Sequence, residues 1–122
     1  GSSQILVAGE KMEPRIYDAG SLVEGTKLEK QPGLIFAAGY SVDGTKLALA
    51  GSAKELRVYD AESGQRIAGL RSEQGWIYAL AFNAAGDRLA TAGYEGTLRI
   101  WDLEMGKGLV EVIPVILERA GR

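Results

Sequence analysis

Short apolar runs separated by small and polar turn residues set the pattern of this chain. In its later half the pattern predicts a strand at residues 76–82, a tight reversal at 83–87 and a second strand at 88–93. Strict alternation marks a two-faced third strand at 98–102, and a glycine-rich turn leads to a fourth at 109–113. No segment keeps a helical period of apolar residues long enough to indicate a helix instead of strands, so we predict an all-β chain.

The same unit recurs every 42 residues, from 18 to 60 to 102, without insertions. The phrases AGEKMEPRIYD, AGSAKELRVYD and AGYEGTLRIWD align position by position, and residues 33–47 match residues 75–89 at the same offset. Each phrase ends in an aromatic residue and an aspartate, namely Tyr17 and Asp18, Tyr59 and Asp60, and Trp101 and Asp102. A fixed period of this length indicates a repeat architecture.

These residues resemble the tryptophan–aspartate (WD) repeat β-propeller family. The resemblance rests on LRIWD at 98–102 with its relatives LRVYD and PRIYD, on the turn SVDGTKL at 41–47 with its partner NAAGDRL, and on the period. It covers roughly residues 5 to 113. The resemblance implies a ring of blades of four antiparallel strands, with the first strand of each blade lining a central channel and the fourth outside.

This strand order implies that the first blade lacks its innermost strand. Residues 34–40 and 76–82 would be inner strands, whereas the chain opens on a second strand at 5–8. We therefore expect two complete blades and one incomplete blade. The expected divisions are a cloning scar or disordered start at 1–4, an incomplete first blade at 5–32, a second blade at 33–74, a third at 75–114, and a tail at 115–122 that supplies a closing strand.

Three blades do not close a ring, because propellers typically hold four to eight. An open arc exposes apolar blade faces and an unpaired strand edge, which tend to recruit other chains. In one closure, copies assemble by rotation, two making six blades, and the tail enters a neighbour as its missing inner strand. In the other, the missing blades come from a complementary chain or from elsewhere in the same protein.

The candidate ring-closing residues lie at the two ends of the chain. They are Ile5, Leu6 and Val7 on the edge, and Val115, Ile116 and Leu117 in the tail. A frayed, disordered tail is the alternative.

The composition of the chain argues against two classes of partner, nucleic acids and membranes. With 14 basic and 16 acidic side chains and a net charge of -2, the chain has no electrostatic footprint for nucleic acid. No apolar run is long enough to span a membrane. We therefore expect a soluble chain with neither nucleic-acid nor membrane partners. The absence of cysteine does not assign a compartment.

Candidate chemistry is sparse. The chain has no histidine and no cysteine, which excludes imidazole bases, thiol nucleophiles and the metal sites built from them. Its glycine-rich segments lack the Gly-Lys-Ser/Thr ending of a phosphate loop. Carboxylate pairs such as Asp60 with Glu62 fall in turns, where solvated charge is the better interpretation. We expect no catalytic residues, no cofactor and no metal.

The repeat positions favour structural roles. Each strand-ending aspartate is expected to accept backbone N–H bonds from the following turn, and each preceding aromatic residue to pack between blades. The glycine–histidine pair implied by the resemblance is missing, and Trp76 and Leu34 stand near its place. The buried hydrogen-bond network of a WD blade therefore cannot form in its usual way, and stability is expected to depend on packing.

Three residues near the blade-joining loops are candidates for contact with a partner: Arg71, Trp76 and Tyr94. Core or rim packing is the alternative for each. The function that fits best is a non-enzymatic propeller segment that assembles with other blades, with a homodimer favoured, into a scaffold for a protein or peptide ligand. Two alternatives remain, a regulatory or docking part of a larger enzyme and a purely structural self-assembling fragment.

Overall fold

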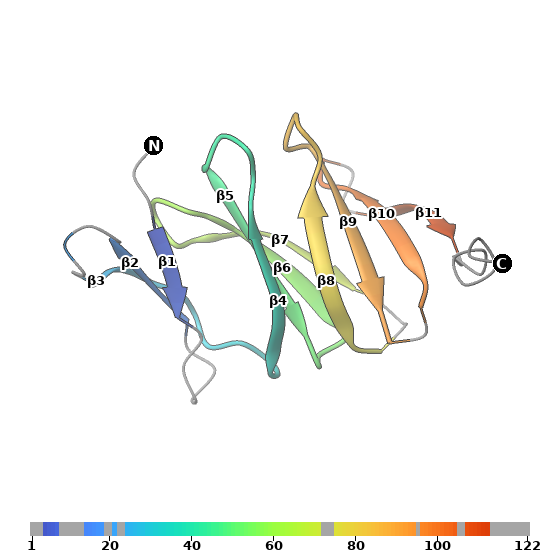
Figure 1. Cartoon of the computed structure of the whole chain (residues 1–122), viewed down its shortest axis with the longest axis horizontal. Coiled ribbons are helices and arrows are strands. Elements are labelled where there is room, and N and C mark those ends of the chain that lie inside the picture. The colour runs from blue at the N-terminus through green and yellow to red at the C-terminus, as the bar shows by residue number, and fades with distance from the viewer. Residues whose placement is uncertain are drawn as a thin grey trace, which may run out of the picture.

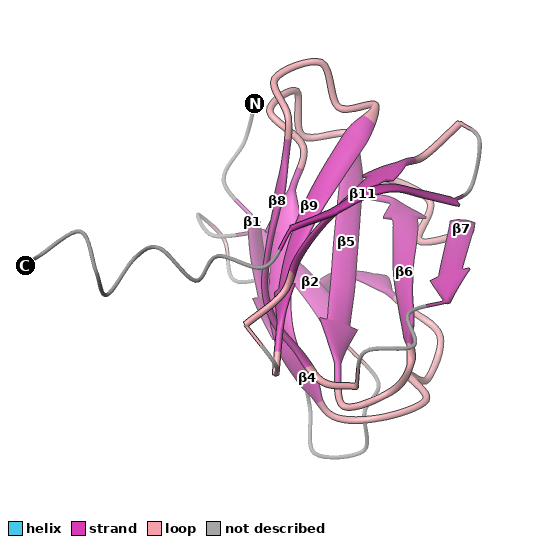
Figure 2. Cartoon of the chain, turned by 90° about the vertical axis from the view of Figure 1, so that its right-hand side faces the viewer, coloured by secondary structure: helices cyan, strands magenta, loops and turns pink. Residues whose placement is uncertain are grey.

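The protein, described here as a computed structural model, is built of strands. The structure describes residues 4–7, 14–18, 21, 24–71, 75–94, 96–104 and 107–112. Within these ranges the chain forms eleven strands in three antiparallel sheets and no helix (Figures 1 and 2). The predicted all-β class is therefore confirmed.

Each sheet is a meander whose strands follow chain order. The first sheet contains β1 (Gln4–Val7), β2 (Arg15–Asp18) and β3 (Glu24–Lys27). The second contains β4 (Ile35–Tyr40), β5 (Lys46–Gly51), β6 (Glu55–Asp60) and β7 (Arg66–Arg71). The third contains β8 (Ile77–Phe82), β9 (Arg88–Gly93), β10 (Leu98–Asp102) and β11 (Lys107–Val112). The described residues thus form two four-stranded sheets and one three-stranded sheet, which is consistent with the predicted two complete blades and one blade that lacks a strand.

The hairpin turns of the second and third sheets repeat one hydrogen-bonding scheme. Ser41 Oγ accepts the backbone N–H of Lys46 at 3.0 Å, and Asn83 Oδ1 accepts that of Arg88 at the same distance. Gly44 and Gly86 have φ of 77° and 78°, a conformation that glycine adopts without steric cost. The 42-residue repeat in sequence is therefore also a repeat in turn geometry.

The second sheet lies between the other two and packs on both (Figure 1). Successive residues of a strand point to opposite faces. Leu47 and Leu49 of β5 join Ile16 of the first sheet and Leu28, the residue directly after β3, in one buried cluster. Ala48 and Ala50 of the same strand join Leu89 and Trp101 of the third sheet in the other. Every strand position of β5 from residue 47 onward is buried.

This packing defines two faces for each sheet. The rear face points to the preceding sheet in the chain, and in the second sheet it is formed by Leu47, Leu49 and Tyr59. The forward face points to the following sheet, and in the second sheet it is formed by Ala48, Ala50, Leu56 and Val58. In Figure 2, β5, β6 and β7 follow one another across the molecule, so both faces extend over the full width of the sheet.

The start of β4 requires a glycine opposite it. The pairing of β4 with β5 shifts between Ile35 and Ala37, which leaves Phe36 as an extra residue in a β-bulge. Leu34 donates its N–H to Ser52 Oγ at 2.8 Å, and its carbonyl accepts the N–H of Ser52 at 2.9 Å. A methyl group on Gly51 would overlap the carbonyl oxygen of Leu34.

We therefore expect Gly51→Ala to lower the free energy of unfolding by about 3 kcal/mol, because the bulge must move to relieve the overlap. Gly25→Ala in β3 is the matched control, since its methyl group would meet only Ile16 O, at 3.5 Å. Urea unfolding followed by tryptophan fluorescence measures both variants. Equal losses in the two variants would contradict the bulge argument.

The turn before β5 also predicts a pH dependence. Asp43 accepts hydrogen bonds from the N–H and hydroxyl of Thr45 and from the hydroxyl of Ser41, and the backbone bond is the largest cause that lowers the pKa of Asp43 to about 2. A carboxyl group with a depressed pKa stabilises the fold above its unfolded pKa of about 3.9 and loses that contribution as pH falls toward 2. Asp43→Asn should therefore flatten the decline in thermal stability between pH 4 and pH 2. An unchanged pH profile would show that the turn does not titrate this way.

Candidate functional site

Four aromatic side chains meet at one end of β4 and β8, and we call them the aromatic cluster: Phe36, Trp76, Tyr78 and Tyr94. The Phe36 and Tyr78 rings stack with centroids 5.3 Å apart at an interplanar angle of 24°. Trp76 lies 5.4 Å from Phe36, and Tyr94 lies 6.4 Å from Trp76. These spacings are typical of favourable aromatic pairs.

The β-bulges explain why Phe36 and Tyr78 stack. They are repeat equivalents, and each is the extra residue of a bulge at the start of its strand. Because a bulge redirects its extra side chain, both rings turn to the same end of their sheets. Tyr94 is held beside them by its backbone N–H, which donates to the carbonyl of Trp76 at 2.8 Å.

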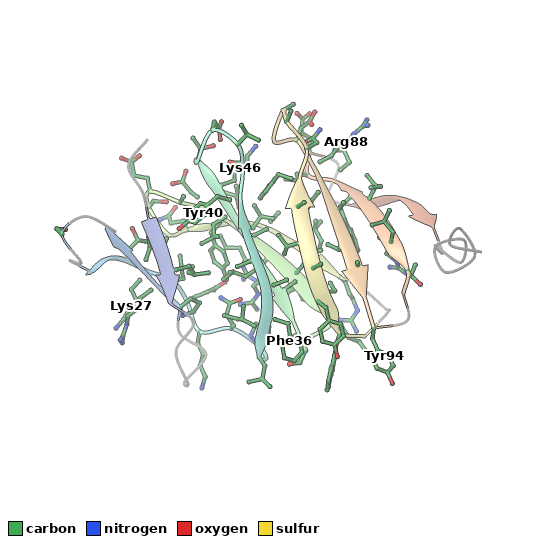
Figure 3. All side chains as sticks on the ribbon, viewed as in Figure 1. Lys27, Phe36, Tyr40, Lys46, Arg88 and Tyr94 are labelled. Atoms are coloured by element: carbon green, nitrogen blue, oxygen red, sulfur yellow. The ribbon has the colours of Figure 1, made fainter. Side chains whose placement is uncertain are left out.

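The aromatic cluster is open to solvent. Trp76 and Tyr78 are each 46% exposed and Tyr94 is 69% exposed, and Leu34, two residues before Phe36 in the chain, is 58% exposed. Figure 3 places Phe36 and Tyr94 at the end of the molecule opposite Lys46 and Arg88. A contiguous surface of large apolar side chains at one end is therefore available for contact.

The structure brings two of the three predicted contact residues together. Trp76 and Tyr94 belong to the aromatic cluster, whereas Arg71 lies at the end of β7, paired across the sheet with Glu55. Sequence reasoning missed Phe36 and Tyr78. Their signal was an aromatic residue directly after an isoleucine at the head of each inner strand, 42 residues apart.

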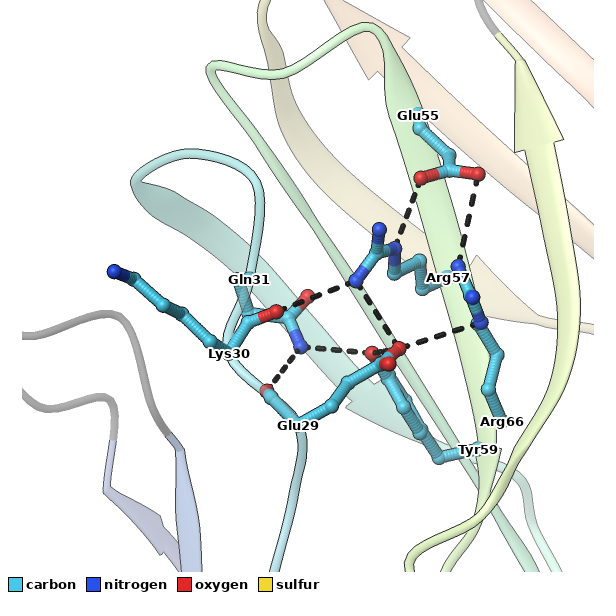
Figure 4. Close-up of polar contacts among 7 residues, drawn as sticks. All are labelled: Glu29, Lys30, Gln31, Glu55, Arg57, Tyr59 and Arg66. Carbon is cyan, nitrogen blue, oxygen red and sulfur yellow. Dashed lines mark hydrogen bonds and ion pairs between the residues drawn. The ribbon is translucent and has the colours of Figure 1, made fainter.

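A second polar arrangement surrounds Tyr59 (Figure 4). The Tyr59 hydroxyl donates to Glu29 Oε2 at 2.6 Å and accepts from Gln31 Nε2 at 2.8 Å. Tyr59 and Gln31 are buried, at 0% and 6% exposure. Burial raises the pKa of Tyr59, and the hydrogen bond to the Glu29 carboxylate raises it further. Tyr59 therefore remains a neutral phenol that ties the β3–β4 connection to β6.

Two arginines complete this network. Arg57 donates to Glu55 at 2.9 Å and to Glu29 at 3.1 Å, and Arg66 lies 3.3 Å from Glu29. Glu29 thus receives two guanidinium groups and a phenol. This arrangement stands where the resemblance implied a histidine network, and its charges are satisfied within one sheet and its connection. We interpret it as structural.

The other repeat positions also lie in strands. Trp101 Nε1 donates to Thr91 Oγ1 at 2.9 Å inside the third sheet. Asp60 accepts the N–H groups of Glu62 and Ser63, both at 2.9 Å, and these backbone bonds lower the pKa of Asp60. Asp102 lies 4.0 Å from Arg88 Nε.

The remaining predicted positions concern the first sheet and the tail. Tyr17 and Asp18 lie in β2, and their side chains fall outside the described part. Ile5, Leu6 and Val7 belong to β1, an edge strand of the described first sheet, and Leu6 packs on the cluster around Leu47. Val115, Ile116 and Leu117 lie outside the described residues.

The described residues offer neither a metal site nor a membrane-spanning helix. Within the described ranges, no three acidic side chains converge on a point where a metal ion could bind. No helix long and apolar enough to cross a bilayer occurs in that part of the chain.

The Tyr59 network predicts the effect of removing one hydroxyl. Tyr59→Phe removes one of the two acceptors of the buried Gln31 amide and the phenol donor of Glu29, and should lower the free energy of unfolding by about 1–3 kcal/mol. Tyr94→Phe is the matched control, because its hydroxyl is on an exposed ring, and should change stability by less than about 0.5 kcal/mol. Chemical unfolding measures both, and a neutral Tyr59→Phe would refute the stabilising role of the network.

Comparison with known proteins locates one repeat. Residues 64–102 match the family model described as WD domain, G-beta repeat. The matched segment runs from the turn before β7 to the last residue of β10, so it spans two sheets. No curated protein matches the chain. The match at residues 64–102 supports a WD repeat in this part of the chain, and the three antiparallel sheets are consistent with propeller blades.

Proposed function

We propose that this chain is a non-enzymatic WD-repeat segment that assembles with other blades into a closed ring and serves as a scaffold for protein interaction. WD repeats are generally non-catalytic interaction modules, which supports the coarse assignment. The ligand we propose is a protein or peptide segment that docks at the aromatic cluster.

The observation that carries the binding proposal is the exposure of the aromatic cluster. Aromatic side chains that already contact one another lose little conformational freedom on binding, and tryptophan and tyrosine dominate interface hot spots. Trp76 and Tyr94 are held in place by ring contacts and a backbone bond, yet about half of each side chain or more is open. The cluster is therefore an ordered apolar surface rather than a core.

The proposed assembly follows from the sheet count. Propellers typically close with four to eight blades, and the described residues form three sheets. Further blades would come from a second copy, which we favour, or from a complementary chain. The edge of β1 would accept an added strand, and the tail residues 115–117 are our candidate for it.

A peptide-display selection against the intact chain tests the binding site. Peptides selected on the wild type should bind Trp76→Ala or Tyr94→Ala at least about tenfold more weakly, since hot-spot truncations cost about 2 kcal/mol. Titration calorimetry gives the affinities.

Val42→Ala is the matched control for this selection. Val42 is 77% exposed and lies in the β4–β5 turn, at the other end of β4 from Phe36. Its substitution should leave the affinities unchanged. Peptides insensitive to both aromatic variants would overturn the proposed site.

A further inference from the structure

The third sheet has an apolar forward face that no described residue of the chain covers. Leu89 and Trp101 pack on the second sheet, so the alternate residues of β9 and β10 point the other way. These residues form the forward face of the third sheet: Ala90, Ala92, Leu98 and Ile100. All four are partly exposed.

The equivalent face of the second sheet shows what this surface is shaped to contact. Its residues lie 42 positions earlier, are of the same apolar kind, and are 0–4% exposed because the third sheet covers them. Alanine occupies the same two positions of the second strand in both sheets, which allows a neighbouring sheet to approach closely. The open forward face therefore repeats an interface that the chain already forms once between its second and third sheets.

We propose that the forward face of the third sheet docks the first sheet of a second copy of this chain, head to tail. This inference rests on the proposed function and assigns its assembly surface. In this contact, the first sheet of the second copy would pack on the third sheet in the same way as the third sheet packs on the second sheet within one chain.

The first sheet has the pairing that this interface requires. A rear face is built on an aliphatic residue of one strand paired with an aromatic residue of the next, as Leu47 with Tyr59 and Leu89 with Trp101. Ile5 pairs with Tyr17 in the same register of the first sheet. By sequence and strand register, the chain thus carries an aliphatic–aromatic pair at equivalent positions of all three sheets.

The polar rim of the interface repeats as well. Between the second and third sheets, Lys46 Nζ donates to the carbonyl of Gly86 in the β8–β9 turn at 2.8 Å, which bridges the two sheets. Arg88 stands 42 residues after Lys46, at the same end of β9, and is exposed. A long cation therefore lies at the rim of the open face, in the place where its equivalent already binds a neighbouring backbone.

Self-association of the intact chain tests the proposal. Light scattering at micromolar concentration should give a dimer or larger closed assembly for the wild type. Ile100→Asp on the forward face and Tyr17→Asp on the first sheet should each weaken self-association at least about tenfold. Each variant places a charge on one of the two different surfaces that meet in a head-to-tail contact. Ile67→Asp, at a 53% exposed position of β7, is the matched control and should assemble as the wild type does.

Two outcomes decide the matter. A wild-type monomer would overturn the proposal, as would assembly by Tyr17→Asp with loss in Ile100→Asp, which indicates two third sheets packed face to face. If Ile100→Asp fails to fold by circular dichroism, Ala92→Glu takes its place. Peptide binding at the aromatic cluster is measured separately, so failure of the binding site leaves this result readable and failure of assembly leaves the binding result readable.

Discussion

The structure depends on one constraint, that a sheet with two apolar faces must be covered on both sides. The second sheet meets it, since β5 sends leucines to the first sheet and alanines to the third. Burial of one large apolar side chain such as leucine contributes about 1.5–3 kcal/mol, so loss of either cover would remove a large part of the stability of the second sheet. The first and third sheets are each covered on one described side. Among the described residues, the open forward face of the third sheet is therefore the place where this packing rule is left unmet.

The polar contacts of the second and third sheets differ, whereas their apolar face-to-face positions are alike. Trp101 satisfies its indole N–H on Thr91, but the equivalent pair in the second sheet is Tyr59 and Leu49, which cannot bond in the same way. The Tyr59 hydroxyl reaches instead to Gln31 and Glu29 in the connection before β4. The second and third sheets thus each fix the strand that carries this aromatic residue by a local solution, which is possible because the apolar contacts already set the spacing of the sheets.

The sequence was sufficient for the strands and turns and insufficient for the site. Alternating residues and repeated turns depend on local geometry, so β9 and β10 were predicted with their observed bounds. Strand ends beside a bulge differ from the predicted ones. Trp76, for example, was predicted as the first residue of a strand but lies before β8. The stacking of Phe36 on Tyr78 could not be predicted, because it requires two bulges in different sheets to lie side by side. The Tyr59 network was missed for a similar reason, since Glu29 and Gln31 belong to a connection without a pattern of its own.

The matched WD segment does not coincide with one sheet, and this offset bears on how blades join. It includes β7, the last strand of the second sheet, together with β8, β9 and β10 of the third. One sequence repeat therefore links two neighbouring blades through covalent chain, in addition to the apolar contacts between their faces. An interface between separate chains lacks that link and depends on the faces alone. For this reason the proposed assembly depends most on one property. The open forward face of the third sheet closely matches the buried forward face of the second sheet.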